Sequence, residues 1–251
     1  MAWFLTKPLL FMLVFDQTGM KSASTLLDRC KFLMIPFFVV AFSLFSSCKK
    51  DDIEGNEKVK GEAKIKFINA SLGSSAIDFY VDDTKVNELT LAYGQGSEYI
   101  KIPSGSKTTK VNEGVGTLEA SANYNFIPTF SYTSFFVGDK EGKGEVLTFE
   151  DNLGAVDRDK SRVRFINLSP NFTNALNVSL PGRELVVNAL AFRESSDYFL
   201  IDPDTNIGIS IVGTGVLKIA SGNEFTGGKN YTIWLSGTSN SNLSINKITY
   251  N

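Results

Sequence analysis

Few side chains in this chain suit covalent or acid–base chemistry. The 251 residues include two cysteines and no histidine. The lack of histidine excludes Ser-His and Cys-His nucleophile pairs and removes the commonest metal ligand. Both cysteines, Cys30 and Cys48, lie in the first fifth of the chain, so the rest can hold neither a disulfide nor a cysteine zinc site. A net charge of −2 argues against nucleic acid as a partner, because phosphate binding needs clustered cations.

Cys48 stands just after an apolar segment. Phe32 to Phe45 is a run of 14 residues without charge, and Arg29 and Lys31 precede it. A basic flank, an apolar core and then small residues are the layout of a secretory signal peptide. The run is shorter than the roughly 20 residues of a membrane span. A buried core helix is the alternative, but the polar stretch from Lys49 to Gly61 leaves nothing nearby to pack against it.

The residues around Cys48 resemble the lipobox of bacterial lipoproteins, in which small residues lead directly into a cysteine. Ser46 and Ser47 fill the small positions, whereas Phe45 stands where the pattern prefers leucine. The resemblance implies that the Cys48 thiol carries acyl chains such as palmitate and becomes the first residue after cleavage. Each buried CH₂ of such a chain contributes about 0.8 kcal/mol, so two or three chains hold a protein on a bilayer. We therefore expect residues 1–47 to be a lipoprotein signal peptide and Cys48 to be the lipidation site, with the membrane as a partner.

The residues after the cysteine indicate where in the cell the protein is located. The stretch from Lys49 to Asp52 resembles the export signal of Bacteroidetes-type surface lipoproteins, in which lysine is followed by acidic residues. We therefore expect a lipid-anchored protein of the outer membrane that is exposed at the cell surface, with a periplasm-facing position as the alternative. Residues 48–61 are charged and poor in apolar side chains, as in a flexible tether.

Two methionines, Met1 and Met20, are candidates for the start of translation. Residues 1–19 fit no part of a signal peptide, whereas a start at Met20 gives a compact leader with three basic residues before the apolar run. We expect Met1 to be an over-called start.

Three acidic clusters could offer carboxylate oxygens to calcium. They are Asp82-Asp83, Asp157 with Asp159, and Asp202 with Asp204. None has the D-x-[DN]-x-[DN]-G spacing of a calcium loop, and aspartate favours turns by bonding its own backbone. Turn and linker roles are therefore favoured. A glycosidase would need two carboxylates about 5–9.5 Å apart across a cleft. We expect no metal, no cofactor and no catalytic residue.

The rest of the chain, residues 62–251, contains an internal repeat and is called the body. KIKFIN at Lys64 to Asn69 returns as RVRFIN at Arg162 to Asn167, an offset of 98 residues that becomes 99 further along. The matches at the second offset include Leu91-Ala92-Tyr93 with Leu190-Ala191-Phe192, Ser97-Glu98-Tyr99 with Ser196-Asp197-Tyr198, Leu118 with Leu217, and Gly138 with Gly237. The repeat predicts domains at residues 62–152 and 161–251, joined by a polar linker at 153–160.

Within each copy the apolar period is two. Ile65 and Phe67 alternate with Lys64 and Lys66, which predicts a strand with one apolar and one cationic face. Further strands are predicted at Ile77–Val81, Ser97–Ile102, Lys107–Val111, Gly116–Ser121, Tyr132–Val137, Val146–Glu150 and Leu176–Leu180. No stretch of the body carries a helical apolar stripe. Short half-buried strands with regular turns indicate an all-β fold, with two tandem antiparallel β-sandwich domains of immunoglobulin-like type after the signal segment.

The first copy carries a set of motifs in a fixed order. They are KIKFINAS, AIDFYVDD, LAYGQGSEYIKIPSG and YTSFFVG over residues 64–138. Together they resemble the bacterial domain of unknown function numbered 4397, and the second copy repeats the resemblance more weakly. Asn69 stands where that family often has histidine, Asp83 where it has glycine, and Arg193 where the first copy keeps Gly94. The resemblance implies an extracytoplasmic β-sandwich on secreted or lipid-anchored proteins, and it implies no established activity.

Aromatic residues crowd one region of the first copy. They are Tyr124, Phe126, Phe130, Tyr132, Phe135 and Phe136. An exposed row could stack on sugar rings or pack on a protein partner. A core role is favoured, because Phe126 and Tyr132 have equivalents in the second copy at Phe225 and Tyr231.

These observations favour a non-enzymatic, lipid-anchored protein of the cell envelope. Its two sandwiches would serve protein binding, adhesion or envelope architecture, with an unidentified envelope protein as the partner. The alternative is a glycan-binding accessory lipoprotein of a nutrient-uptake system, with a surface glycan as the partner. A glycan binder should expose two or three coplanar aromatic rings, whereas a protein-binding module should expose an apolar patch or a flat edge strand.

Overall fold

The structure is a computed structural model that describes residues 61–113, 117–138, 143–170, 174–182, 185–215, 217–237 and 239–250. The predicted signal peptide, Cys30, Cys48 and nearly all of the predicted tether lie outside these residues. Among the described residues, no helix is long and apolar enough to span a membrane.

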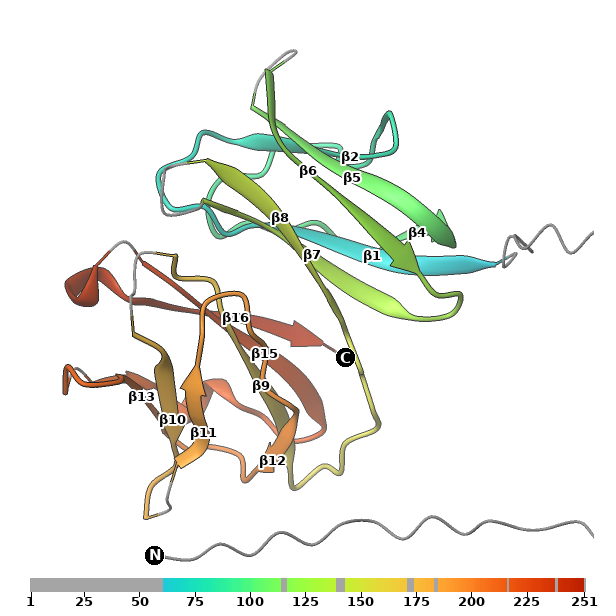
Figure 1. Cartoon of the computed structure of the whole chain (residues 1–251). Helices are drawn as coiled ribbons and strands as arrows, with labels where there is room; N and C mark the ends of the chain where they lie inside the picture. The colour runs from blue at the N-terminus through green and yellow to red at the C-terminus, as the bar shows by residue number, and fades with distance from the viewer. Residues whose placement is uncertain are drawn as a thin grey trace, which may run out of the picture. The chain divides into compact units, whose positions relative to one another are not determined.

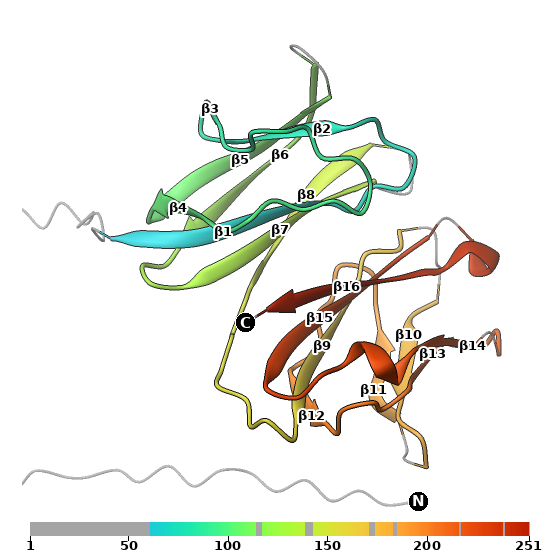
Figure 2. The same cartoon turned by 180° about the vertical axis from the view of Figure 1, so that it is seen from behind.

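The first copy folds into two four-stranded sheets that face each other (Figures 1 and 2). Its strands are β1 (Glu62–Asn69), β2 (Ile77–Val81), β3 (Thr84–Lys85), β4 (Ile100–Pro103), β5 (Gly105–Glu113), β6 (Thr117–Phe126), β7 (Ser131–Gly138) and β8 (Gly144–Glu150). The first junction sheet has the order β4-β1-β7-β8, and the first outer sheet has the order β3-β2-β5-β6.

The second copy repeats this arrangement. Its strands are β9 (Ser161–Asn167), β10 (Leu176–Ser179), β11 (Leu185–Leu190), β12 (Phe199–Ile201), β13 (Ile207–Ile211), β14 (Leu217–Ala220), β15 (Lys229–Ser236) and β16 (Ser244–Tyr250). The second junction sheet has the order β12-β9-β15-β16, and the second outer sheet has the order β11-β10-β13-β14. Two short 3₁₀ turns, at Gly222–Glu224 and Asn240–Asn242, complete the copy.

The two copies share their strand register as well as their topology. Ile65 of β1 pairs with Tyr132 of β7, and Val163 of β9 pairs with Tyr231 of β15. Equivalent positions of the two copies are therefore 98 residues apart in the first strand of a copy (β1 and β9) and 99 apart in its seventh strand (β7 and β15). These are the two offsets of the sequence repeat. The predicted all-β fold of two tandem sandwiches is confirmed.

One detail of the prediction differs, because the junction sheets are not wholly antiparallel. β1 runs parallel to β7, and β9 runs parallel to β15. A hairpin cannot join parallel neighbours, so the chain crosses to the outer sheet and returns before the second strand of each pair is formed. The apolar alternation in the sequence is the same for both orientations, and for this reason it could not reveal the parallel pairs.

Alternation along the strands fills a separate core inside each sandwich. Ile65 and Phe67 of β1, and Val163 and Phe165 of β9, are completely buried between the two sheets of their copy. A turn follows β10, where Gly182 has φ of 66°, a conformation that glycine adopts without strain.

Candidate functional site

The outward faces of the two junction sheets pack against each other. The resulting apolar cluster contains Ile68, Ala70, Phe135 and Val137 from the first sandwich and Ile166, Leu168, Trp234, Ile248 and Tyr250 from the second. Phe135 and Trp234 are both buried, with ring centroids 6.0 Å apart. We call this contact the junction. It joins the described residues of both copies into one compact unit.

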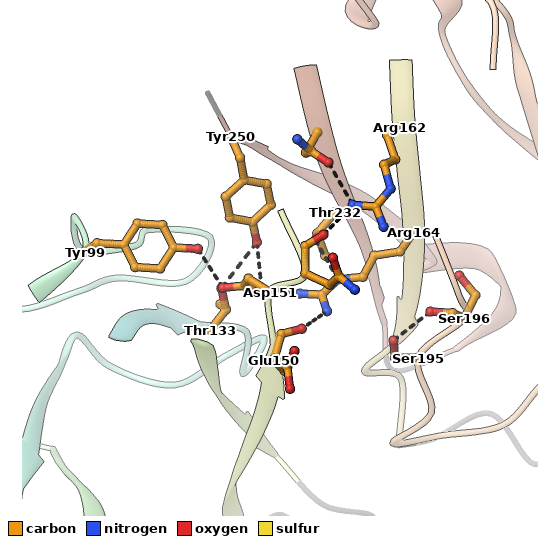
Figure 3. Close-up of polar contacts among 12 residues, drawn as sticks. Tyr99, Thr133, Glu150, Asp151, Arg162, Arg164, Ser195, Ser196, Thr232 and Tyr250 are labelled. Carbon is orange, nitrogen blue, oxygen red and sulfur yellow. Dashed lines mark hydrogen bonds and ion pairs between the residues drawn. The ribbon is translucent and has the colours of Figure 1, made fainter. Parts of the chain in front are cut away.

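Asp151, which follows β8, is the polar centre of the junction. Its carboxylate forms an ion pair with Arg164 of β9, and the two residues are only 5% and 3% exposed. Tyr99 Oη and Thr133 Oγ1 each donate a hydrogen bond of 2.6 Å to Asp151 Oδ2. Tyr250 Oη donates to Oδ1 at 3.3 Å. Figure 3 shows these side chains from both sandwiches converging on the one carboxylate.

Each nitrogen of the Arg164 guanidinium has a hydrogen-bond partner. It donates to the carbonyl oxygen of Glu150 and, through Nε, to Thr232 Oγ1 at 2.8 Å. Its guanidinium lies 5.1 Å from the ring centroid of Tyr198. A buried ion pair of this kind sets orientation more than it adds stability, but removal of one partner leaves an uncompensated buried charge.

The tyrosines around the carboxylate are held in the neutral form. Burial raises the pKa of Tyr99 well above its usual value, and the Asp151 carboxylate raises it further. The same two causes, in the same order, raise the pKa of Tyr250. Both phenols therefore remain hydrogen-bond donors to Asp151 throughout the neutral and mildly alkaline range.

Two polar cavities lie at the junction, and each is lined by both sandwiches. The first, of about 360 Å³, is lined by Lys66, Ser97 and Glu98 of the first sandwich and by Trp234, Lys247 and Thr249 of the second, among others. The second, of about 490 Å³, is lined by Glu150 and Asn152 together with Arg162, Arg164, Asp197 and Tyr198.

Arg162 is the least neutralised cation of the second cavity. It donates to the carbonyl oxygen of Asn152 and to Asn230 Oδ1 at 3.2 Å, and it lies 4.2 Å from the ring centroid of Tyr198. Within the described part of the chain, no carboxylate oxygen lies within 4.0 Å of its guanidinium. The remaining donors could bind an anionic group, but Glu150 and Asp197 carry the opposite charge in the same cavity.

The first outer sheet presents a polar surface. One row of directly opposed residues crosses its strands as Lys85, Tyr80, Lys110 and Ser121. Lysines on this sheet are paired with carboxylates: Lys85 with Asp78 at 2.9 Å, Lys110 with Asp83 at 2.6 Å, and Lys107 with Asp82 at 2.9 Å.

The second outer sheet exposes apolar side chains on its two edge strands. The equivalent row reads Leu185, Ser179, Gly208 and Ile219. Leu185 is 48% exposed and Ile219 is 60% exposed, and Leu217, one row along, is 59% exposed. The residues between them, Ser179 and Gly208, are small. A larger residue does not fit at position 208 without a shift, because a Cβ there would come within 2.8 Å of Ser179 Oγ. We call Leu185, Leu217 and Ile219 the apolar face.

The acidic clusters named from the sequence serve as turns and ion pairs. Asp82 adopts φ of 53° after β2, and a hydrogen bond from Lys107 lowers the pKa of its carboxyl. Lys160 Nζ lies 2.5 Å from Asp202 Oδ1, and the carbonyl oxygen of Asp157 accepts from Gly228. In the described residues, no three histidine, cysteine or acidic side chains come together in a way that could hold a metal ion.

Most of the crowded aromatics belong to the cores, as predicted. Phe126, Phe135, Phe136 and Tyr132 are each at most 4% exposed, whereas Phe130 is 40% exposed. Tyr132 Oη accepts a hydrogen bond of 3.1 Å from the backbone of Ile127, and the equivalent Tyr231 Oη accepts one of 2.8 Å from Thr226. The pair therefore fixes the same corner in both copies.

Two of the positions that depart from the family pattern have structural roles. Asn69 is buried, and its side chain donates to the carbonyl oxygen of Leu91 at 3.0 Å and accepts from the backbone of Ser71. Arg193 has φ of 72°, where Gly94 in the first copy has φ of 81°, and it forms an ion pair with Glu145 at 2.9 Å. The unusual backbone of Arg193 is thus offset by a contact across the junction.

Sequence reasoning missed the junction. The alternation in β9 indicates only that Arg162 and Arg164 share the cationic face of a strand, and residues 153–160 are predicted to be a polar linker. A signal was present in β7 and β15, where Phe135 to Val137 and Ile233 to Leu235 are continuous apolar runs. Such runs indicate strands that are buried on both faces. Cys48, the one site residue predicted from the sequence, lies outside the described residues.

Comparisons with known proteins add a family. Residues 63–179 match the model of a family described as "Domain of unknown function (DUF4397)", which covers nearly all of the first sandwich and runs to the end of β10. No curated protein matches the chain.

The similar chains among solved structures include two further proteins. CBMbc, a family CBM26 module of Eubacterium rectale Amy13K solved in complex with maltoheptaose, is 9% identical with a TM-score of 0.25, over 75% of this chain and 96% of that chain. A Parabacteroides distasonis protein provisionally assigned to cell adhesion is 7% identical with a TM-score of 0.21, over 76% of this chain and 99% of that chain. Residues 63–179 therefore match the DUF4397 domain family, as the motifs of the first copy predict.

Proposed function

We propose that this protein is a non-enzymatic lipoprotein of the bacterial cell envelope that binds an envelope protein through the apolar face of its second sandwich. Cys48 carries the acyl anchor, residues 48–61 form the tether, and the outer membrane holds the protein with its body at the cell surface. The domains are residues 62–152 and 161–251, with a linker at 153–160. The lipobox-like sequence supports the anchor, and the geometry of the outer sheets supports the binding surface.

The apolar face is the observation that carries the proposal. Leu185, Leu217 and Ile219 are about half to three-fifths exposed on one side of a four-stranded sheet. Full burial of a side chain of this size contributes about 1.5–3 kcal/mol, so leaving three of them in water on one face is unfavourable unless a partner covers them. Lys85 and Ser121 stand in the first sandwich at the positions of Leu185 and Ile219, whereas Leu217 corresponds to Leu118, so the sandwich fold itself does not require apolar residues at the first two positions.

Glycan binding is less well supported. Sugar platforms use exposed aromatic rings, and Phe130 is the single aromatic among the large hydrophobic side chains that are strongly exposed in the described residues. Trp234, the largest ring at the first cavity, is 2% exposed and offers no face to a sugar. The convergent polar groups at the second cavity lack an open ring too, because Arg162 and Arg164 lie over Tyr198.

The anchor is tested in cells by acyl labelling and fractionation. Cys48→Ala should abolish incorporation of a labelled fatty acid and move the protein to the soluble fraction, whereas Cys30→Ala should change neither. Labelling that survives in Cys48→Ala would refute the lipid anchor. Digestion by a protease added to intact cells would support surface exposure, and protection from it would place the body in the periplasm.

The binding surface is tested by site-specific photo-crosslinking in intact cells. A photoreactive amino acid in place of Ile219 should give a discrete adduct with one envelope protein. The same amino acid in place of Ser121, the matched position of the first outer sheet, should give none. Leu217→Ser should weaken the adduct at position 219. Equal adducts at both positions, or none at either, would contradict the proposal, and glycan binding by the purified body that Ile219→Ser leaves unchanged would favour the alternative.

A further inference from the structure

The junction pairs two copies of the same surface. Phe135 and Trp234 occupy equivalent positions of β7 and β15, and they contact each other. Asp151 and Tyr250 are equivalent as well, since Asp151 bonds to Ser131 of β7 and Tyr250 lies opposite Asn230, the equivalent residue of β15. Tyr250 Oη donates to Asp151 Oδ1. Contact between a residue and its own equivalent marks the axis of a two-fold, isologous interface.

Contacts away from this axis occur in matching pairs. Lys66 lies 5.0 Å from the ring centroid of Tyr99 in its own sandwich and 5.8 Å from that of Tyr250 in the other. Its equivalent Arg164 lies 5.1 Å from the ring of Tyr198 in its own sandwich and pairs with Asp151 in the other. In each sandwich, therefore, one cation contacts a tyrosine of its own copy and also the residue at the end of the other copy's last strand.

The two cavities obey the same relation. Lys66, Ser97, Glu98 and Thr249 line the first, and their equivalents Arg164, Ser196, Asp197 and Glu150 line the second. In each case the first three residues come from one sandwich and the fourth comes from the other. A two-fold relation between the sandwiches produces such a pair of hollows, one on either side of the axis.

From this symmetry we infer that the junction face is a self-association surface, and that a second copy of this chain can replace the chain's own partner sandwich. In the exchanged dimer, the first junction sheet of each chain packs on the second junction sheet of the other. Every contact of the junction, including the Asp151–Arg164 ion pair, is then formed twice. The dimer closes because both pairs of faces are used, so no face is left to extend a polymer.

The segment between β8 and β9 decides between the two arrangements. Joined by residues 151–160, the two faces of one chain meet at a high effective concentration, which favours the intramolecular junction. A connection too short to allow that contact without strain removes this advantage and leaves the contact between chains unaffected. Shortened connections are a known route to exchanged dimers.

Connection length is the variable that tests the inference. One variant of the body lacks residues 154–157, and its matched control carries four added glycine and serine residues after Gly154. Light scattering after size exclusion should give the mass of two chains for the shortened variant and of one chain for the control. Trp234→Ala in the shortened background should return most of the protein to the monomer, whereas Ile219→Ser should not. A folded shortened variant that stays monomeric, or a dimer that Trp234→Ala leaves intact, would overturn the inference.

A second measurement covers a shortened variant that does not fold. Isotopically heavy and light chains of the unaltered body are unfolded together and refolded at rising protein concentration. Native mass spectrometry should then show a heavy–light dimer whose share grows with concentration and which persists on dilution. Monomers alone at every concentration would refute a self-complementary junction.

Discussion

The junction sheets and the outer sheets of this protein have diverged to different degrees. On the junction sheets, the cation, tyrosine and large ring of the first copy are matched by Arg164, Tyr198 and Trp234 in the second. On the outer sheets, the row of lysine, tyrosine, lysine and serine in the first copy corresponds to a row of leucine, serine, glycine and isoleucine in the second. Apart from Asp151, whose equivalent is Tyr250, these residues of the packed faces keep their chemistry, whereas the rows of the outer sheets differ.

The difference teaches where binding can be sought. A surface that is buried at the junction must retain complementary shape and paired charges, because each unpaired buried group costs free energy. An outer sheet has only to keep its inward residues, so its outward residues are free to take on a partner. The apolar face is such a change, and it lies on the copy whose resemblance to the family motifs is weaker.

The largest effect is expected from breaking the junction at its polar centre. Asp151→Ala leaves Arg164 buried without a counter-charge, which should lower the free energy of unfolding by about 3–5 kcal/mol. Chemical denaturation of the body measures it. Asp197→Ala, which removes an exposed carboxylate at the second cavity, should change the stability by less than about 0.5 kcal/mol. Similar losses in both variants would show that the junction is not special.

The next effect concerns the apolar face. Ile219→Ser should weaken binding to the crosslinked envelope protein about 10- to 100-fold, which corresponds to about 1.4–2.8 kcal/mol. The loss follows because a half-buried apolar contact is replaced by a polar side chain. Titration with the purified partner measures it, and Ser121→Ala on the first outer sheet is the matched control. If both changes weaken binding equally, the contrast between the outer sheets has no functional meaning.

Alkaline pH should destabilise the protein through the buried tyrosines of the junction. The pKa values of Tyr99 and Tyr250 are raised in the folded protein, so their stabilising contribution is complete below the ordinary tyrosine pKa of about 10 and is lost as the pH rises above it. Each tyrosine should lower the free energy of unfolding by at most about 1.4 kcal/mol per pH unit in that range. Denaturant titrations between neutral and strongly alkaline pH measure this slope. Tyr99→Phe should reduce it, and an unchanged slope would contradict the burial of this phenol.

The smallest effect is expected on the first outer sheet. Lys110→Ala removes an ion pair to Asp83, whose side chain is 92% exposed. Exposed pairs contribute about 0–1 kcal/mol, so thermal unfolding should shift little, and added salt should abolish the difference from the unaltered chain. A large, salt-independent loss would mean that this surface is covered by a partner as well.

Much of the fold could be predicted from the sequence, because alternation and internal repetition are local signals. The pattern around Ile65 and Phe67 located β1, and the two offsets of the repeat reappear in the strand register. The contact between the copies could not be predicted in the same way. Arg164 looks like any outward cation in an alternating strand, and only the position of Asp151 in space makes it a buried partner. The apolar face was also beyond reach, since Leu185 on one edge strand and Leu217 and Ile219 on the other come to lie in one sheet only when its four strands pair.

Calorimetry of the body tests most directly whether the equivalent junction faces unite the two sandwiches. If the Asp151–Arg164 pair and the shared apolar cluster couple the copies, the body should unfold in a single transition. Its calorimetric and van't Hoff enthalpies should then agree. Asp151→Ala should split that transition in two. Two separate transitions in the unaltered protein, insensitive to Asp151→Ala, would contradict the account.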